Sequence, residues 1–522
     1  MSGHVFITCA NLEKLACDAW LLPTNRNKVV MPYWENQYLK ELGVVGGDGA
    51  GFDIPDDFGD ANRTARPTHW PDESERPMPI LTITGPDEPK GVDWYLEAVT
   101  AFVKSYQETN TRYLTYRVRP LLGIPLVGSG AGGAASQIAS LINHLIDLCE
   151  NLVKEHQLDL AIVVKDSFHY SVCQKERRQR DKASNLWPAL SPQQKESGRK
   201  IAEHAHQGEL VVFLGAGISA GAGLPSWGQL IQRLVEKAEL SDEQHKAMQQ
   251  FNFLDQAEIL NKQLSKAGLN MNREIVEILT REKIYSLAHT LISDWPVDET
   301  VTQNYDNMFE MACRDNDKPL SVIPYSYEEG TGKWILKMHG CVTKPDDIVL
   351  SRSDYLDYDY SRSALSGIVQ ALLVTKHMLF LGFSLTDDHF IQLIFGVQKA
   401  VADMKGSNDQ RKFGSVLTPV RSAMQEELWS QDLNFVHSDY EGDHFLQALN
   451  WHDVFLDYVT CMVHTSQHYV FRKEYDELLS EDDLMLRDGL EELYQKTQGN
   501  SDSSLKRHFE SYLKSLGKDL PS

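Results

Sequence analysis

The sequence predicts an α/β protein with a doubly wound parallel sheet at about residues 200–460, a smaller α/β domain before it and a helical C-terminal tail. Three observations predict this fold class. Short apolar runs alternate with amphipathic stretches, as in strand–helix–strand units. A glycine-rich segment follows an apolar run at 123–133 and again at 215–223. The chain has 522 residues, too many for one small domain.

The composition is that of an ordinary globular protein, with 42% hydrophobic and 24% charged residues. It excludes a disordered or collagen-like chain. Lys and Arg number 51 and Asp and Glu 74, which gives a formal net charge of −23. Because this overall field repels polyanions, we do not expect direct nucleic-acid binding.

The seven cysteines are scattered and contain no C-x-x-C pair. This pattern argues against a disulfide framework and against a structural zinc site. The N-terminal residues lack a basic stretch followed by an apolar one, so we expect a cytoplasmic protein without a secretory signal. The most apolar long stretch, Ser366–Leu385, is interrupted by polar residues, and we expect no membrane span.

Residues 1–173 carry the pattern of the smaller α/β domain. Ala135–His156 places apolar residues at helical spacing between two apolar runs. The expected strands are His4–Thr8, Ala19–Leu22, Ile80–Ile83, Leu122–Val127 and Leu158–Val164.

Residues 174–199 are polar, contain two prolines and have no sustained period, so we expect a linker. The basic residues from Lys175 to Lys182 are interrupted by Glu176 and Asp181, which favours a solvated segment over a phosphate contact.

Residues 200–460 alternate expected strands with helical stretches such as Trp227–Ala238 and Asn272–Thr280, which predicts the doubly wound sheet. The strands are expected at Leu210–Leu214, Thr300–Thr302, Leu320–Pro324, Ile335–Met338, Met378–Leu381 and Asn434–Val436. Residues 461–522 become helical and rich in carboxylates, and we expect a docking helix with an acidic face there.

The loop after the strand at Leu210–Leu214 has glycines at 215, 217, 221 and 223 and then enters a helical stretch. Glycines let a backbone turn tightly beside a pyrophosphate, while N–H groups at a helix start face the negative charge. The spacing is one residue longer than G-x-G-x-x-G. A tight turn without a ligand is the alternative interpretation.

Three later motifs also follow expected strands: TQNYD at Thr302–Asp306, KMHG at Lys337–Gly340 and LGFSLTD at Leu381–Asp387. With G-A-G-x-S-x-x-x-G-x-P in the glycine loop, they occur in the order found in sirtuins. Residues 200–460 therefore resemble the Rossmann-type NAD-binding domain of the sirtuin family. In open α/β sheets the carboxyl ends of the strands bind the ligand.

Sirtuin deacylases carry two C-x-x-C pairs after the catalytic histidine, whereas only Cys341 stands there in this chain. The combination resembles the sirtuin-like NAD hydrolases of bacterial antiphage defence, either of the Thoeris type or paired with a HerA-type ATPase. This resemblance implies hydrolysis of NAD to nicotinamide and ADP-ribose, with NAD as the substrate and no metal. The reaction builds positive charge on the ribose, as in other glycoside chemistry.

The same resemblance implies roles for individual residues. His339 would act as a base or hydrogen-bond partner toward a ribose hydroxyl or water, Asn304 would orient water and ribose, and Asp306 and Gln303 would hold the nicotinamide amide. The nucleotide-binding positions implied are Gly215, Ala216, Gly217 and Ser219 at the phosphates, Gly382 and Ser384 on the adenosine side, and Pro225 and Trp227 at the end of the loop.

The N-terminal domain resembles a macro domain in two places. At Leu12–Asn25 an Asp-Ala strand leads to an asparagine loop, and Gly123–Gly133 resembles the second phosphate loop of that family, while another glycine-rich stretch occupies 43–51. The resemblance implies an ADP-ribose-like ligand on backbone N–H groups. A degenerate nucleotide-binding fold that serves assembly or regulation is the alternative.

Unregulated loss of NAD would be toxic, so the resemblance implies gating through a homo-oligomer, a HerA-type ATPase or a phage-derived activator. Two other functions stay open: an NAD-dependent protein deacylase or ADP-ribosyltransferase at the same site, and a non-catalytic NAD or ADP-ribose sensor. The missing zinc cysteines count against the first, and Asn304 with His339 count against the second.

Overall fold

The computed structural model divides the chain into two compact units, residues 1–189 together with 464–522 (unit 1) and residues 190–463 (unit 2). It describes residues 3–34, 39–40, 51–68, 76–109, 116–130, 133–281, 284–401, 412–441, 444–498 and 503–520. Each of the strands expected from the sequence is present. Among the described residues, no helix combines the length and apolar character that crossing a bilayer requires.

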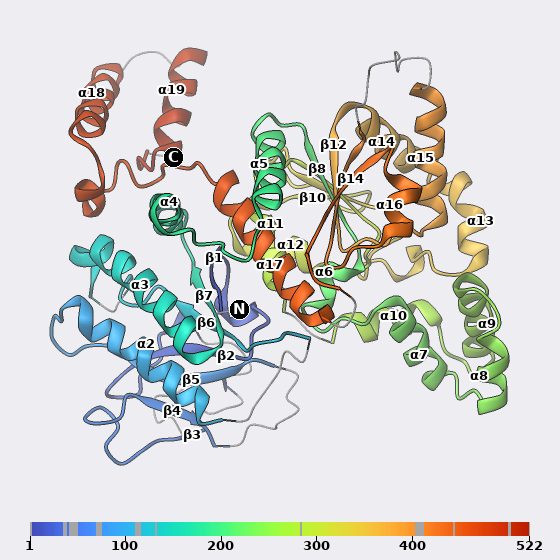
Figure 1. Cartoon of the computed structure of the whole chain (residues 1–522), viewed down its shortest axis with the longest axis horizontal. Coiled ribbons are helices and arrows are strands. Elements are labelled where there is room, and N and C mark those ends of the chain that lie inside the picture. Colours follow the sequence, from blue (N-terminus) through green and yellow to red (C-terminus); the bar gives the residue numbers. More distant parts are fainter. Residues whose placement is uncertain are drawn as a thin grey trace. The chain divides into compact units, whose positions relative to one another are not determined.

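Unit 1 is built on a mixed sheet whose order is β1-β7-β6-β2-β5-β4-β3. The first five strands in this order run parallel, and β4 and β3 are antiparallel additions at one edge. Its strands are β1 (Val5–Cys9), β2 (Ala19–Asn25), β3 (Phe52–Asp53), β4 (Thr64–Pro67), β5 (Met78–Gly85), β6 (Leu121–Pro125) and β7 (Asp159–Val164). Its longer helices are α2 (Val92–Gln107), α3 (Ile138–His156), α4 (Ser167–Ser184), α18 (Glu481–Thr497) and α19 (Ser504–Ser515). Helices α2 and α3 lie side by side on the sheet (Figure 1).

The segment expected to be a linker is helical, so that prediction is wrong. Helix α4 runs through its first half, and α5 (Pro192–His206) begins in its second half with a Ser191 capping box. Two buried polar residues of α4 face the sheet: Gln174 Nε2 donates to the Ile7 carbonyl at 3.3 Å and Arg177 to the Val5 carbonyl at 3.1 Å. Because β1 is an edge strand, these side chains satisfy its backbone. Because the buried face of this helix is polar, its sequence lacks the helical repeat of apolar residues that would have predicted it.

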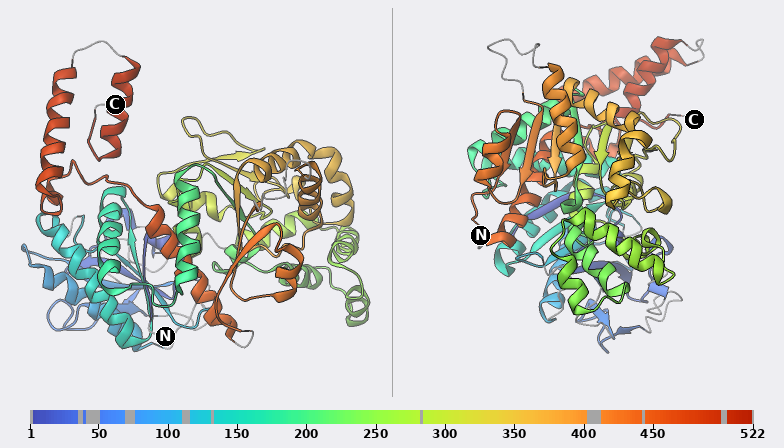
Figure 2. Two further views of the ribbon diagram at one scale, coloured as in Figure 1. Left: turned by 45° about the horizontal axis from the view of Figure 1, so that its top comes forward. Right: turned by 90° about the vertical axis from the view of Figure 1, so that its right-hand side faces the viewer.

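The C-terminal segment is helical, as predicted, and it packs into unit 1. Tyr469, Val470, Tyr475 and Leu516 belong to the same apolar core as α3 and β7. The 3-10 helix η6 (Lys473–Leu478) leads into α18, and α18 and α19 contact each other (Figure 2). The tail is therefore part of the core of unit 1.

Unit 2 contains a fully parallel sheet with the order β10-β11-β9-β8-β12-β13-β14, which confirms the predicted parallel α/β architecture. Its strands are β8 (Leu210–Leu214), β9 (Glu299–Thr302), β10 (Ser321–Ile323), β11 (Trp334–Lys337), β12 (His377–Leu381), β13 (Gly414–Thr418) and β14 (Leu433–His437). The next strand in sequence after β8 lies on one side of it and β12 lies on the other. The strand order thus reverses beside β8, where open α/β sheets form their ligand crevice.

Helices pack on both sides of this sheet. Those between β8 and β10 are α6 (Ala216–Ala220), α7 (Trp227–Lys237), α8 (Asp242–Met248), α9 (Phe253–Lys266), α10 (Met271–Leu279), α11 (Leu287–Ser293) and α12 (Met308–Asp315). The later ones are α13 (Arg352–Ser361), α14 (Ser363–Thr375), α15 (Asp388–Val401), α16 (Ala423–Trp429) and α17 (Phe445–Val463). Helices α13 to α15 share an apolar core with β8 and β12, and α17 packs against α5 (Figures 1 and 2).

The loops that follow β8 and β12 pack backbone against backbone. The Gly215 N–H donates to the Leu381 carbonyl and the Gly217 N–H to the Gly382 carbonyl, both at 2.9 Å. A Cβ on Gly215 would lie 2.4 Å from the Gly382 oxygen, and one on Gly382 would lie 2.5 Å from the Ile218 nitrogen. Gly382 also has φ +62°, where side chains are disfavoured. The glycines are thus required by the contact between the loops.

Gly382→Ala should destabilise unit 2 by about 2–4 kcal/mol, since it adds a close backbone contact and a left-handed alanine. Gly367→Ala is the matched control, because Gly367 is exposed in α14 with open space around its Cβ position. That change should stabilise the helix by about 0.5–1 kcal/mol. Urea denaturation of both variants measures the difference, and equal midpoints would contradict the packing argument.

Candidate functional site

The predicted TQNYD motif lies directly beneath the glycine loop of β8. Thr302 Oγ1 donates to the Leu214 carbonyl at 2.8 Å and accepts from the Asn304 N–H at 3.0 Å. Asn304 Nδ2 then donates to the Gly215 carbonyl at 3.0 Å. The amide nitrogen of Asn304 is therefore committed to the loop, and its oxygen remains the group available to a ligand or water.

Asp306 holds the same loop from below. Its Oδ2 accepts from Ser219 Oγ at 2.9 Å and its Oδ1 from the Met308 N–H at 3.1 Å. The fully buried Lys337 donates to the Asp306 carbonyl and pairs with Glu310 at 2.7 Å. Both carboxylate oxygens of Asp306 are thus used within the protein, and Ser219 is only 2% exposed. This geometry gives Asp306 and Ser219 a supporting role around Asn304.

The glycine loop offers fewer free N–H groups than its sequence predicts. The N–H groups of Gly215 and Gly217 donate to the loop after β12, and the Ile218 N–H donates to the Gly215 carbonyl at 3.2 Å. A phosphate contact through Gly215 or Gly217 would require these bonds to break. Gly382, which the resemblance places on the adenosine side, follows the neighbouring strand β12 and contacts this loop.

His339, which follows β11, is 3% exposed and lies among residues that the sequence did not single out as site residues. Its Nε2 lies 3.3 Å from Nδ1 of His389, in the first turn of α15. Burial lowers the pKa of His339 to about 4; His389 and Arg362 act in the same direction, and Asp387 opposes them. His339 is therefore neutral at pH 7 and presents no positive charge to a cationic centre.

Asp387 links the predicted Gln303 to this cluster. Its Oδ1 accepts from Gln303 Nε2 at 2.7 Å and from the Phe390 N–H at 2.9 Å, and its Oδ2 accepts from the Tyr355 hydroxyl at 2.7 Å. Burial opposes ionisation of Asp387, but the hydrogen bonds that its carboxylate accepts outweigh burial, so its pKa lies below the usual range. The site thus keeps a half-buried negative charge next to Gln303.

His339, Asp387 and His389 offer ligand atoms that all lie within 4.8 Å of one another, so they could hold a divalent metal ion. Three donors already occupy the Asp387 carboxylate, which leaves about one of its roughly four lone-pair directions. The two imidazoles also bond to each other. The donor set is therefore better satisfied by internal hydrogen bonds than prepared for a metal.

The other predicted positions lie around the rim. Ser384 is exposed, and its Oγ bonds to Thr386 at 2.7 Å. Pro225 and Trp227 are half-buried at the start of α7, where Ser226 forms a capping box. Among the described residues, no hydrogen bond joins these three side chains to His339 or Asn304.

Sequence reasoning did not assign Asp387, His389 or Tyr355 to the site. Asp387 closes the quoted motif LGFSLTD, so its place after β12 was a usable signal. His389 and Tyr355 come from α15 and α13, and each forms part of an ordinary helical pattern. Only the packing of those helices brings them to His339.

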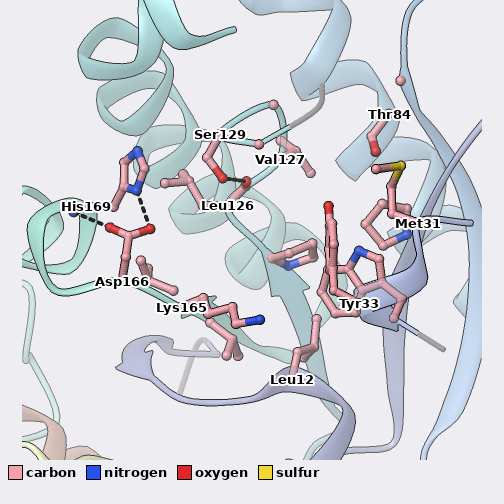
Figure 3. Close-up of a pocket in the computed structure, with 18 of the residues that line it drawn as sticks. Leu12, Met31, Tyr33, Thr84, Leu126, Val127, Ser129, Lys165, Asp166 and His169 are labelled. Carbon is pink, nitrogen blue, oxygen red and sulfur yellow. Dashed lines mark hydrogen bonds and ion pairs between the residues drawn. The ribbon is translucent and has the colours of Figure 1, made fainter. Parts of the chain in front are cut away.

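Unit 1 contains a cavity of about 500 Å³ at the carboxyl ends of its parallel strands (Figure 3). Four strands supply polar residues to its wall: Asn25 ends β2, Thr84 lies near the end of β5, Ser129 follows β6, and Lys165 and Asp166 follow β7. Asp166 Oδ2 contacts His169 Nδ1 at 2.5 Å in the wall. Of the glycine-rich segments expected there, Gly128–Gly130 line the cavity, whereas residues 41–50 and 131–132 lie outside the described residues.

Comparison with known proteins identifies residues 298–436 as a match to the SIR2-like domain family. Defense-associated sirtuin 2 of Bacillus subtilis is 26% identical over 242 residues, which cover 44% of this chain and 23% of that protein. NAD(+) hydrolase ThsA of Bacillus cereus (strain MSX-D12) is 26% identical over 208 residues, 38% of this chain and 41% of the relative. NAD(+) hydrolase ThsA of Enterococcus faecium is 24% identical over 206 residues, which cover 38% of this chain and 42% of the relative.

The chain thus matches less than half the length of these curated relatives. The match includes the TQNYD, KMHG and LGFSLTD motifs of residues 302–387. It confirms the predicted resemblance of this region to sirtuins and to the defence sirtuin and NAD hydrolase relatives. The macro-like character of unit 1 stays a prediction.

His289 offers a test of burial near the site. Its Nδ1 accepts from the Ser286 N–H at 3.3 Å, in a capping box of α11, and burial lowers its pKa to about 4. The unfolded chain has a pKa of about 6.5 at this residue and takes up a proton first as the pH falls. The contribution of His289 to the free energy of unfolding is therefore fully present above about pH 6.5 and is lost as the pH falls toward 4.

His289→Gln keeps the capping box, because glutamine also serves at its third position. When the pH falls from 7 to 5, the free energy of unfolding should drop by about 2 kcal/mol more in the wild type than in this variant. Urea denaturation at both pH values measures this, with His206→Gln, at an exposed position on α5, as the control. An unchanged pH dependence in His289→Gln would refute the burial argument.

Proposed function

We propose that unit 2 hydrolyses NAD at the reversal of its strand order, releasing nicotinamide and ADP-ribose. The observation that carries this proposal is that Gln303 and Asn304, which follow β9, and His339, which follows β11, lie at the same carboxyl edge of the sheet as the two glycine loops. The match to proteins named NAD(+) hydrolase supports the same reaction class.

The chemistry follows from the charges at this edge. As the bond between the nicotinamide nitrogen and the ribose breaks, the electron pair leaves with nicotinamide and the ribose becomes oxocarbenium-like. A neutral His339 does not repel this cation, and the carboxylates of half-buried Asp387 and buried Asp306 favour it. Water then adds to the ribose carbon and gives up one proton.

Individual side chains take distinct parts in this reaction. The oxygen of Asn304 accepts a hydrogen bond from water or a ribose hydroxyl, while its nitrogen stays bonded to Gly215. Gln303, held by Asp387, faces the nicotinamide amide. His339 accepts a proton or hydrogen bond from a ribose hydroxyl or the attacking water. Ala216 and Ser384 lie on the loops that would border the phosphates and the adenosine.

His339→Ala and Asn304→Ala should each lower the rate of nicotinamide release from NAD by about 10²–10⁴-fold, the usual effect of removing an acid–base group or a preorganised polar group. His206→Ala, on α5, is the matched control and should retain the wild-type rate. Chromatographic measurement of nicotinamide and ADP-ribose with the full chain tests this.

The alternatives predict different products. A deacylase or ADP-ribosyltransferase releases nicotinamide only when an acyl-peptide or acceptor protein is added. A sensor binds NAD and releases none under any condition. Either pattern would overturn the hydrolase proposal.

The cellular role we propose is NAD depletion in antiphage defence, in the cytoplasm, after activation. The relative Defense-associated sirtuin 2 is, by its name, linked to defence. A homo-oligomer, a HerA-type ATPase or a phage-derived protein would supply the activation. The first test is whether nicotinamide release by the full chain changes with protein concentration, as an assembly-gated enzyme requires.

We also propose that unit 1 is macro-like and that its cavity binds ADP-ribose or a related nucleotide. The supporting observation is the cavity itself, which opens where five parallel strands end and is bordered by the turn at Gly128–Gly130. Its volume of about 500 Å³ lies within the usual range for small-molecule sites. Lys165 lies at the cavity, with its Nζ 5.6 Å from the Tyr33 ring centroid, and offers a cation to a phosphate.

In His339→Ala protein, Lys165→Met should weaken ADP-ribose binding about tenfold, because a charge-assisted phosphate contact is lost. Lys154→Met, at an exposed lysine of α3 away from the cavity, is the control and should bind as before. Isothermal titration calorimetry measures both. No saturable heat with any variant would favour a purely structural role for unit 1.

A further inference from the structure

A second histidine, His389, lies directly behind His339 in unit 2. The two rings meet edge to face, with centroids 5.4 Å apart and planes at 74°, and Nδ1 of His389 lies 3.3 Å from Nε2 of His339. Both side chains are buried, at 5% and 3% exposure. A buried imidazole pair of this kind must share its protons in a definite pattern, because each contact needs one donor and one acceptor.

The ring of His389 is fixed by two tyrosines of α13. Tyr355 and Tyr358 each stack on it with ring centroids 4.0 Å away, at interplanar angles of 13° and 29°. Two near-parallel rings at this distance cannot share one face, so His389 lies between them. The packing leaves the imidazole little freedom to turn.

The third contact of His389 decides where its proton lies. Its Nε2 lies 3.3 Å from the backbone carbonyl of Tyr355, and a carbonyl oxygen can only accept. The proton of neutral His389 is therefore on Nε2, and Nδ1 carries the lone pair. Nε2 of His339 must then be the donor in the contact between the two histidines.

This pattern of hydrogen bonds leaves Nδ1 of His339 as an acceptor. With its proton on Nε2, neutral His339 has its lone pair on Nδ1, and no hydrogen-bond partner faces Nδ1 among the described residues. Asp387 stabilises the arrangement by accepting from both the Tyr355 hydroxyl and the Phe390 N–H, which ties α13 to the first turn of α15. The hydrogen bonds thus run from the Tyr355 carbonyl through His389 to His339, and Nδ1 of His339 is the nitrogen left to accept.

We propose that His389 is a positioning residue that holds His339 as the tautomer with its proton on Nε2, so that Nδ1 is the nitrogen that accepts from substrate or water. The catalytic meaning of this assignment rests on the proposed NAD hydrolysis, whereas the tautomer does not. A positioning histidine of this kind contributes to turnover and little to NAD binding.

The tautomer is measured by NMR of the full chain with ¹⁵N-labelled histidine, with the His339 signals assigned by their loss in His339→Ala. We expect Nε2 of His339 to be protonated and Nδ1 to have the shift of an unprotonated nitrogen. Tyr355→Phe keeps the ring stack and the backbone carbonyl, so it should preserve this pattern. A His339 protonated on Nδ1 in the wild type would overturn the proposal.

Substitution of His389 separates positioning from structural support. His389→Asn places a carbonyl oxygen close to the position of Nδ1, where it accepts from His339, while His389→Leu fills the space without an acceptor. We expect His389→Leu to lower kcat for nicotinamide release about 10–100-fold at a similar KM, the range seen when a group that orients a functional histidine is lost. His389→Asn should recover most of kcat.

The outcomes distinguish the two proposals. If both His389 variants lose kcat in proportion to their thermal midpoints, His389 is only structural and the proposal fails. If the wild type releases no nicotinamide, the hydrolase proposal fails, while the nitrogen shifts of His339 still decide the tautomer. A mixture of both tautomers in His389→Leu, with one in His389→Asn, supports positioning without reference to activity.

Discussion

The structure of unit 2 depends on the contact between the two central strands and the loops that leave them. β8 and β12 pair in parallel register, from Leu210 beside His377 to Leu214 beside Leu381. Their loops continue the pairing through backbone hydrogen bonds that only glycines at 215, 217 and 382 allow. This contact fixes the Gly215 carbonyl, which in turn fixes the amide of Asn304. The glycine loop therefore acts first as the support of the site.

Burial then sets the chemistry of the polar groups that gather there. His339 is kept neutral by burial, while hydrogen bonds from Tyr355, Phe390 and Gln303 hold the pKa of Asp387 below its usual range. An unpaired buried charge would be costly, so the network must be complete for the fold to be stable. A fixed carboxylate beside a neutral imidazole suits a reaction whose transition state carries positive charge. The same arrangement would repel an anionic transition state.

Much of the fold could be predicted from the sequence because its parallel strands are buried and strongly apolar. β13 was not found, since Gly414–Thr418 is short and opens with a glycine that packs against the Met378 carbonyl. Residues 174–199 have the pattern of a linker because the buried face of α4 is polar and bonds to the edge of β1. A local sequence pattern does not reveal to which backbone carbonyl a glutamine or arginine side chain will donate a hydrogen bond.

The candidate site was predictable where motifs follow strands. Asn304, His339 and Gly382 are found in this way, because the carboxyl ends of parallel strands share one edge. The supporting role of Asp306 and Ser219 could not be predicted, because it depends on the hydrogen bond between their side chains. His389 and Tyr355 depend on how α13 and α15 pack, and helix packing is not encoded at any one position. The tail could be identified as helical, but its place in the core of unit 1 could not.

The most direct test of the central claim is hydrogen–deuterium exchange of full-length His339→Ala protein with and without NAD. If the reversal of strand order in unit 2 is the NAD site, NAD should slow exchange in the loops at 215–220 and 382–387 and in the segment at 302–306. Slowed exchange confined to the strand ends around the cavity of unit 1, with these loops unchanged, would contradict the account.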